Sequence, residues 1–357
     1  MPEFVHCLDL CNLFYHEVVQ PVFDSGFPGL PYSAAIIGRG SEVLGFDDEV
    51  SSDHDWGPRV ILFLDEDDHA QRGDALLQAL SQAMPSQSGG YPVCHGIELL
   101  TLPGFLLSCL NLDLRDGIEP IDWLTFPEQK LCSITAGAVY HDELGLQALR
   151  DQFAYYPHDV WLYLLTAGWA RIVQEEHLMG RAGTVGDELG AAIMGSRLVR
   201  DLMRLCFLME KQYAPYPKWF GTAFAKLACG DELLPILRNA QLAKTWKDRE
   251  RHFGAACERV GAKHNALGIT EPVPFTHSSF HDRSYKMCNS GAFGEATRAR
   301  IKDPDLSRLA FRGLFGSIDQ MSDSTNILDN PYWRHALRKL YELASMEHPP
   351  DYGRFDS

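Results

Sequence analysis

The chain is poor in positive charge and has no long uninterrupted apolar run. Its 357 residues contain 32 Lys and Arg against 48 Asp and Glu, which gives a formal net charge of −16. A protein that wraps a nucleic-acid backbone needs a basic surface, so we expect no extended nucleic acid as a partner. The longest apolar stretch, 99–112, is broken by Pro103 and Gly104 and is too short to span a bilayer, so we expect no membrane association.

A basic leader and paired cysteine motifs are also lacking. The first thirty residues contain Glu3, Asp9 and Glu17 but no Lys or Arg, unlike a secretory signal. The nine cysteines include no Cys-x-x-Cys pair, and Cys7 and Cys11 are spaced to share one face of a helix. We therefore expect a cytoplasmic protein whose thiols are reduced and buried.

What is present is an ordinary globular composition whose pattern changes along the chain. Hydrophobic residues make up 45% and charged residues 22%. Short apolar runs predict strands at 33–38, 59–64 and 93–102, and helical spacing predicts helices at 6–20 and 73–84. Beyond these segments, apolar residues recur mostly at helical spacings of three and four.

This change of pattern predicts an α+β fold in two domains. Residues 1–135 are expected to form a small α/β domain with a mixed sheet. Residues 136–357 are expected to form a mostly helical substrate-binding domain.

The acids are concentrated in one segment of the first domain. Ten acids and one base, Arg59, lie between Glu42 and Asp68. Such a run is usually a solvated face. We interpret Asp47 and the two acids after it as solvated loop residues.

Asp53 and Asp55 form an Asp-x-Asp pair within this segment. In an extended chain, side chains two residues apart leave the same face, with Cα atoms about 6.6 Å apart. Two carboxylates so placed can hold divalent cations, Mg²⁺ or Mn²⁺, together with phosphate oxygens of a substrate. A pair of such ions clamps the attacking and leaving oxygens of a phosphoryl displacement.

Gly40 and Ser41 follow the first apolar run and supply a possible phosphate turn. Glycine lets the backbone approach a ligand closely. A helical turn after it would aim free N–H groups at a phosphate, and the Ser41 hydroxyl would add a further donor.

The spacing of these motifs resembles that of the DNA polymerase β-like nucleotidyltransferase superfamily. The pattern is IIGRGS at 36–41, eleven intervening residues, and DHDW at 53–56. The wider chain also resembles an uncharacterised nucleotidyltransferase-like domain family within it, in stretches such as SEVLGFDDEVSSDHDWGPR, MGRAGTVGDELGA and YAPYPKWFGTAFAKL. The resemblance implies the fold of the first domain and metal-dependent chemistry at Asp53 and Asp55, but no particular acceptor. His54 and the Trp56-Gly57-Pro58 interruption depart from the pattern.

Members of this superfamily often use a third acid from a neighbouring strand, and Glu98 is the candidate here. It is a lone acid in the apolar run GIELLTL, and a buried charge needs a partner. Facing the metals, Glu98 would act as a ligand or as the general base for the acceptor. The alternative is an edge-strand carboxylate that points to water.

Basic residues of the second domain are candidate phosphate contacts. Arg197, Arg200 and Arg204 share one helix face, and lysines similar to Lys218 contact triphosphate in the superfamily. The alternative is a solvated stripe that is ion-paired with acids such as Asp201. The Gly-rich segment GRAGTVGD at 180–187 is either an anion cradle or, more simply, a connection that ends in a helix cap.

These features predict a metal-dependent transferase that binds nucleotides. It would move a nucleotidyl group from a nucleoside triphosphate to a small-molecule hydroxyl or amine. Two alternatives stay open. The same Asp-x-Asp metal site could serve a glycosyltransferase with a nucleotide-sugar donor, or the fold could bind nucleotides without catalysis.

Overall fold

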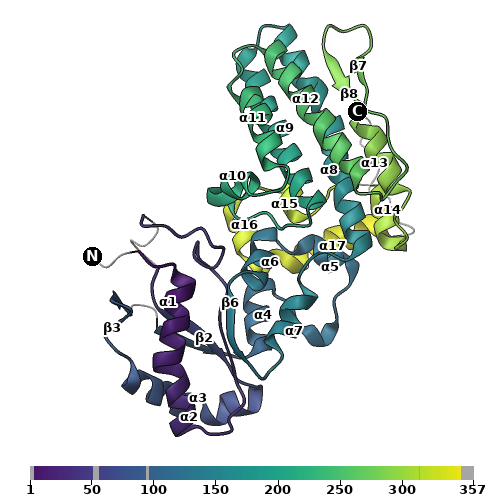
Figure 1. Ribbon diagram of the computed structural model, residues 1–357. Coiled ribbons are helices and arrows are strands. Elements are labelled where there is room, and N and C mark those ends of the chain that lie inside the picture. The colour runs from purple at the N-terminus through teal and green to yellow at the C-terminus, as the bar shows by residue number, and fades with distance from the viewer. Residues whose placement is uncertain (1–3, 51–55, 94–95, 313, 347–357) are drawn as a thin grey trace. The chain divides into compact units, whose positions relative to one another are not determined.

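The computed structural model describes residues 4–50, 56–93, 96–312 and 314–346, and the chain divides into two compact units (Figure 1). The first unit comprises Met1–Gly117 and Glu128–Ala154. The second comprises Ile118–Pro127 and Tyr155–Ser357. A small mixed sheet in a largely helical chain confirms the predicted α+β class.

A four-stranded sheet of order β5-β2-β1-β6 forms the centre of the first unit. Strand β1 pairs antiparallel with both β2 and β6, whereas β5 runs parallel to β2 at the edge of the sheet. Three of these strands lie within the predicted apolar runs, and β6 is an addition to them. The four strands are β1 (Ser33–Ile36), β2 (Arg59–Phe63), β5 (Gly96–Leu100) and β6 (Ala138–Asp142).

Helices cover the two faces of this sheet differently. Alternate residues of β2, Val60 and Leu62, face one side and pack in a buried cluster with residues of helices α2 (Gln20–Gly26) and α3 (Glu66–Ala83). On the other side, the Phe63 ring meets Phe105 of α4 edge-on, with ring centroids 5.7 Å apart. The second face therefore remains only partly covered.

The other elements of the first unit are mostly short helices. One helical segment near the N-terminus contains a π-helical turn, Tyr15–Val19, between α1 and α2. The helices and the small hairpin are α1 (Cys7–Phe14), α2 (Gln20–Gly26), α3 (Glu66–Ala83), β3 (Gln87–Ser88), β4 (Tyr91–Pro92), α4 (Leu102–Leu110), α6 (Glu128–Thr135) and α7 (Leu146–Gln152).

The second unit is built around two long helices, α8 and α9, against which α12 and α13 pack. Its core contains Trp169, which stacks on Phe293 at 4.8 Å between ring centroids. The elements of this unit are α5 (Pro120–Thr125), α8 (His158–Thr184), α9 (Glu188–Met209), α10 (Pro217–Ala225), α11 (Gly230–Leu242), α12 (Trp246–Ala266), β7 (His277–Ser279), β8 (Lys286–Cys288), α13 (Ser290–Arg298), α14 (Pro304–Arg312), α15 (Ile318–Met321), α16 (Thr325–Asp329) and α17 (Arg334–Ser345).

Each unit is made of two segments of the chain, whereas the sequence predicted a single boundary at residue 135. That residue ends α6, and the next strand, β6, pairs with β1 in the first sheet. Helix α5 lies earlier in the chain but packs in the second unit, where buried Asp122 is ion-paired with Arg334 and Arg338 of α17. No helix among the described residues is long and apolar enough to cross a membrane.

The Gly-rich segment 180–187 is a helix end. Gly180 and Gly183 belong to α8, and a Cβ at Gly183 would lie 2.1 Å from the Trp246 ring. The Asp187 carboxylate accepts from the backbone N–H of Gly190 at 2.7 Å and caps α9. These glycines therefore admit neighbouring aromatic rings against α8, and the cap confirms the simpler interpretation of the segment.

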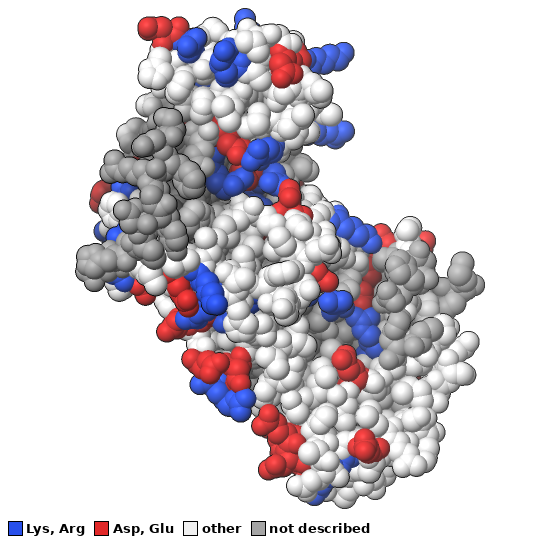
Figure 2. Space-filling model, turned by 180° about the vertical axis from the view of Figure 1, so that it is seen from behind, with Lys and Arg blue, Asp and Glu red and all other residues white. Residues whose placement is uncertain are grey.

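Charged side chains are intermixed on the face drawn in Figure 2. Lys and Arg gather there in small groups with Asp and Glu beside them, and uncharged surface separates the groups. Ion pairs such as Arg298 with Glu295 and Arg308 with Asp305 are local pairs of oppositely charged side chains three residues apart.

Candidate active site

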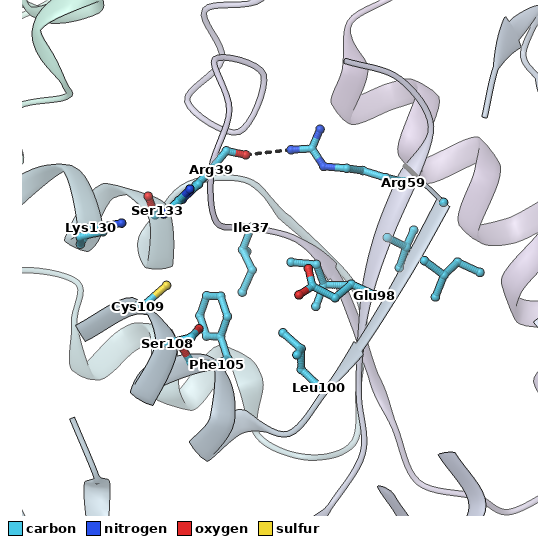
Figure 3. Close-up of a pocket in the computed structure, with 14 residues that line it drawn as sticks. Ile37, Arg39, Arg59, Glu98, Leu100, Phe105, Ser108, Cys109, Lys130 and Ser133 are labelled. Carbon is cyan, nitrogen blue, oxygen red and sulfur yellow. Dashed lines mark hydrogen bonds between the residues drawn. The ribbon is translucent and has the colours of Figure 1, made fainter. Parts of the chain in front are cut away.

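A cavity of about 710 Å³ opens on the partly covered face of the first unit's sheet (Figure 3). The turn after β1, strands β2 and β5, and helices α4 and α6 provide its walls. Apolar side chains form its base, including Ile37, Ile61, Leu100 and Phe105. The polar groups around them are Arg39, Arg59, Glu98, Ser108, Lys130 and Ser133.

Glu98 is the predicted acid that lines this cavity. It stands on β5 directly opposite Ile61 of β2 in the parallel pairing, and its side chain is exposed. Its carboxylate is drawn pointing into the space between the turn after β1 and α4 (Figure 3). An exposed carboxylate on an edge strand, at the wall of a cavity, is open both to water and to a ligand.

The turn after β1 is held in place by contacts with distant residues. The backbone N–H of Gly38 donates to the Ser133 carbonyl of α6 at 2.8 Å. Gly40 has a φ of +129°, and a Cβ there would lie 2.1 Å from the Glu42 carboxylate. A glycine is therefore needed at this position because the Glu42 side chain folds back over it, whether or not a ligand binds there.

The predicted helical turn after Gly40 and Ser41 is not formed. Residues 41–45 form a hydrogen-bonded turn, in which the Phe46 N–H donates to the Ser41 carbonyl at 2.9 Å. A turn lacks the row of free N–H groups at a helix N-terminus. Of this connection, Ile37 and Arg39 line the cavity. A role of Gly40 and Ser41 in phosphate binding stays a prediction.

Arg59 links the turn to strand β2. It is ion-paired with Glu42, which is 3% exposed, and donates through Nη2 to the Arg39 carbonyl at 2.8 Å. The Glu42 carboxylate balances the charge of Arg59. The role of Arg59 is therefore to fix the turn that carries Arg39.

Sequence reasoning missed two cations of the cavity, Arg39 and Lys130. Arg39 is exposed on the turn, whereas Lys130 is 5% exposed on α6. Lys130 gives no local signal, because a lysine in a helix is usually a surface residue. Its place in the wall depends on the long-range contact of Gly38 with α6. Together the two side chains give a cationic wall opposite Glu98 in a strongly acidic chain.

Asp53 and Asp55 lie outside the described residues, but their described neighbours are firmly held. The carboxylate of Asp47 accepts from the Cys7 backbone N–H at 2.7 Å and from Trp56 Nε1 at 3.2 Å. Asp47 is 7% exposed, so its interpretation as a solvated loop residue is wrong. It satisfies the Cys7 N–H at the start of α1 and holds the indole of Trp56, the residue after the Asp-x-Asp pair.

The predicted phosphate contacts of the second unit have local partners. Arg197 is ion-paired with Glu175 at 2.5 Å, and Arg200 with Asp323 at 2.9 Å. The Lys218 ammonium lies 4.8 Å from the Trp219 ring centroid. A role of these residues in phosphate binding stays a prediction.

The described part of the chain contains no group of three or more His, Cys, Asp or Glu side chains that could hold a metal ion. Among the described residues that line the cavity, Glu98 is the one carboxylate. A divalent cation here would therefore need the Asp-x-Asp pair in addition. The donor types fit a hard cation, which prefers carboxylate oxygens.

Comparisons with known proteins give two matches. The profile of a domain family described as domain of unknown function DUF4037 matches residues 123–220. The chain is similar in structure to a nucleotidyltransferase-like protein from Exiguobacterium sibiricum 255-15, with a TM-score of 0.33 and 8% identity, over 76% of this chain and 97% of that chain. A comparison with curated protein sequences finds no match.

Proposed function

We propose that the protein is a metal-dependent nucleotidyltransferase that moves a nucleotidyl group from a nucleoside triphosphate to a small hydroxyl or amine acceptor. The observation that carries the proposal is the position of Glu98. It lines a cavity on the strand beside β2, and the Asp-x-Asp pair lies three residues before β2 in the chain. Added to the Asp-x-Asp pair, the Glu98 carboxylate would complete a set of three oxygen donors that suits this chemistry.

The cations of the cavity support a polyphosphate ligand. Arg39 and Lys130 line the same wall, and Arg59 holds the turn that carries Arg39. Charge-assisted hydrogen bonds from such groups are stronger than neutral ones and suit phosphate oxygens. We therefore assign phosphate binding first to Arg39 and Lys130. Arg197, Arg200 and Lys218 are kept as predicted further contacts.

Asp53, Asp55 and Glu98 would hold one or two Mg²⁺ or Mn²⁺ ions. When bound, such ions neutralise phosphate charge and orient the α-phosphate for in-line displacement. Glu98 would either complete the ligand set or accept the acceptor's proton as the general base. The apolar base of the cavity, with Ile37 and Phe105, would exclude water from the reacting phosphate and so limit hydrolysis.

The released product distinguishes nucleotidyl transfer from the alternative activities. The protein is incubated with Mg²⁺, a mixture of nucleoside triphosphates and a pool of sugars, polyols and amines, and in parallel with nucleotide-sugars. Nucleotidyl transfer releases pyrophosphate, whereas glycosyl transfer releases a nucleoside diphosphate. Glu98→Gln should lower pyrophosphate release at least ~10²-fold, the lower range for loss of a general acid–base group.

The control for this experiment is Glu143→Gln, which alters an exposed acid on the first unit. It should retain wild-type activity. Release of nucleoside diphosphate from the nucleotide-sugar alone would move the assignment to glycosyl transfer. Mg²⁺-dependent nucleotide binding without any product would support a non-catalytic nucleotide-binding protein.

A further inference from the structure

A second cavity, in the helical unit, contains a cysteine and a histidine that face each other. It has a volume of about 290 Å³ and is lined by residues of α8, α12 and the β7–β8 hairpin. Cys288 and His277 are directly opposite in the antiparallel pairing of β7 with β8. The Cys288 Sγ lies 3.4 Å from His277 Nε2, which is hydrogen-bond distance for sulfur.

The surrounding contacts fix both side chains. The Cys288 backbone N–H donates to Glu176 Oε2 of α8 at 2.8 Å, and the Lys286 N–H donates to Glu250 of α12 at 2.8 Å. A Cβ at Gly254 would lie 2.6 Å from the His277 ring. Glycine at this position therefore lets the imidazole pack directly on α12 beside the thiol.

A second thiol, that of Cys257, lies against Cys288 from α12. Hydrogen bonding from Cys257 and from His277 lowers the pKa of the Cys288 thiol to about 6, against the effect of burial. Burial instead raises the pKa of Cys257 well above its ordinary value. The pair therefore consists of one thiolate and one neutral thiol at neutral pH, a combination typical of redox-sensitive cysteines.

The Glu176 carboxyl, which also faces the thiol, does not oppose this charge. Burial raises the pKa of the Glu176 carboxyl to about 9, so it is uncharged near neutral pH. Glu176 is 4% exposed, and its Oε1 is buried without a hydrogen-bond partner among the described residues. The remaining charged groups of the cavity are Glu250, Arg251 and Lys286.

We propose that Cys288 is a redox modification site whose thiolate reacts with a hydroperoxide and is then resolved by Cys257. In the first step an S–O bond forms and the O–O bond breaks. Sulfur is oxidised to sulfenic acid, and the peroxide is reduced to an alcohol or water, which takes its proton from the His277 imidazolium. In the second step the Cys257 sulfur forms the S–S bond, the S–O bond breaks and water leaves with the Cys257 proton.

The test is mass spectrometry of the full chain after exposure to hydrogen peroxide at about pH 7, where an ordinary thiol is mostly protonated. Wild type should lose two hydrogens and yield a peptide pair linked through Cys257 and Cys288. Cys257→Ser should instead gain one oxygen on Cys288, which dimedone traps. Cys288→Ser should show neither change, and circular dichroism checks that each variant is folded.

Cys7 and Cys11 are the internal control. Their sulfurs lie 3.7 Å apart on α1 and both side chains are 0% exposed, without a histidine in the pair. They should stay reduced under the same conditions. Oxidation of these thiols before Cys288, or a Cys257→Ser protein with no trapped sulfenic acid, would overturn the proposal. A trapped sulfenic acid without a disulfide in wild type would overturn the role of Cys257.

Two further measurements follow the thiolate directly and the rate of its oxidation. The difference in thiolate absorbance at about 240 nm between wild type and Cys288→Ser should titrate with its midpoint at a pH of about 6. His277→Gln should slow oxidation about 10-fold at a pH of about 6, because the thiolate fraction falls more than the nucleophilicity rises. An unchanged rate in this variant would remove His277 from the site.

Discussion

The hydrogen bonds of His264, a buried residue of the second unit, determine which ring nitrogen carries its proton. The Trp169 indole N–H donates to His264 Nδ1 at 3.2 Å, so Nδ1 carries no proton and Nε2 carries it. His264 Nε2 lies 3.4 Å from Thr297 Oγ1, which itself donates to the Phe293 carbonyl. A proton on Nδ1 would place two donors against each other. Burial lowers the pKa of His264 to about 4 in agreement with this arrangement.

We predict that this histidine makes the second unit sensitive to acid. The folded-state pKa of about 4 lies below the ordinary value of 6.5, so the unfolded chain takes up the proton first. The contribution to the free energy of unfolding is complete above pH 6.5 and is lost as the pH falls toward 4. The loss is about 3 kcal/mol. Denaturant unfolding of wild type and His264→Gln at several pH values measures it.

Glutamine keeps an acceptor for Trp169 and a donor for Thr297 but does not titrate in this range. The difference in stability between the two proteins should therefore narrow from neutral pH to about pH 4. A difference that is constant with pH would mean that folding does not shift the pKa of His264.

At the scale of elements, helix α8 depends on glycines that admit large neighbours. Gly183 faces the Trp246 ring, and Gly180 faces Tyr285, where a Cβ would lie 2.5 Å from the side chain. Overpacked positions cost more than the entropy gained from replacing glycine. Gly221 on α10 has the opposite environment, since an added Cβ would meet nothing within 4 Å.

We predict opposite effects of alanine at these two helical positions. Gly183→Ala should lower the free energy of unfolding by about 1–3 kcal/mol, because the indole must move. Gly221→Ala should raise it by about 0.5–1 kcal/mol, since alanine is the better helix former on an exposed face. Thermal and urea unfolding of both variants measure the difference. Equal effects would show that the Trp246 contact does not constrain α8.

Local patterns predicted three strands of the first unit's main sheet and the helical character of α1 and α3, but not how these elements meet. The apolar, β-branched runs that contain Ser33–Ile36 and Arg59–Phe63 identified β1 and β2, and Gly96–Leu100 identified β5. Strand β6, AVYHD, alternates too little to be recognised, and its pairing with β1 joins residues far apart in sequence. Glu98 could be proposed as a site residue because its signal, a lone acid in an apolar strand, is local. Lys130 could not, because its position depends on α6 approaching the β1 turn.

At the scale of the whole molecule, the acidic charge is offset locally where a polyphosphate would bind. The chain carries a net charge of −16, yet the cavity of the first unit presents Arg39 and Lys130 alongside Glu98. A wall of this kind raises the local concentration of an anionic ligand despite the overall charge. The proposed activity therefore requires both these cations and the carboxylates that we propose as metal ligands.

The most direct measurement of this claim is isothermal titration of a Mg²⁺–nucleoside triphosphate into the full chain. The Asp53→Asn, Asp55→Asn double variant removes two acids of the proposed metal site. Glu66→Gln with Asp67→Asn removes the same charge from the exposed start of α3 and is the matched control. The account predicts that the first double variant loses Mg²⁺-dependent binding while the control binds as wild type does. Unchanged Mg²⁺-dependent affinity in the Asp53→Asn, Asp55→Asn protein would contradict it.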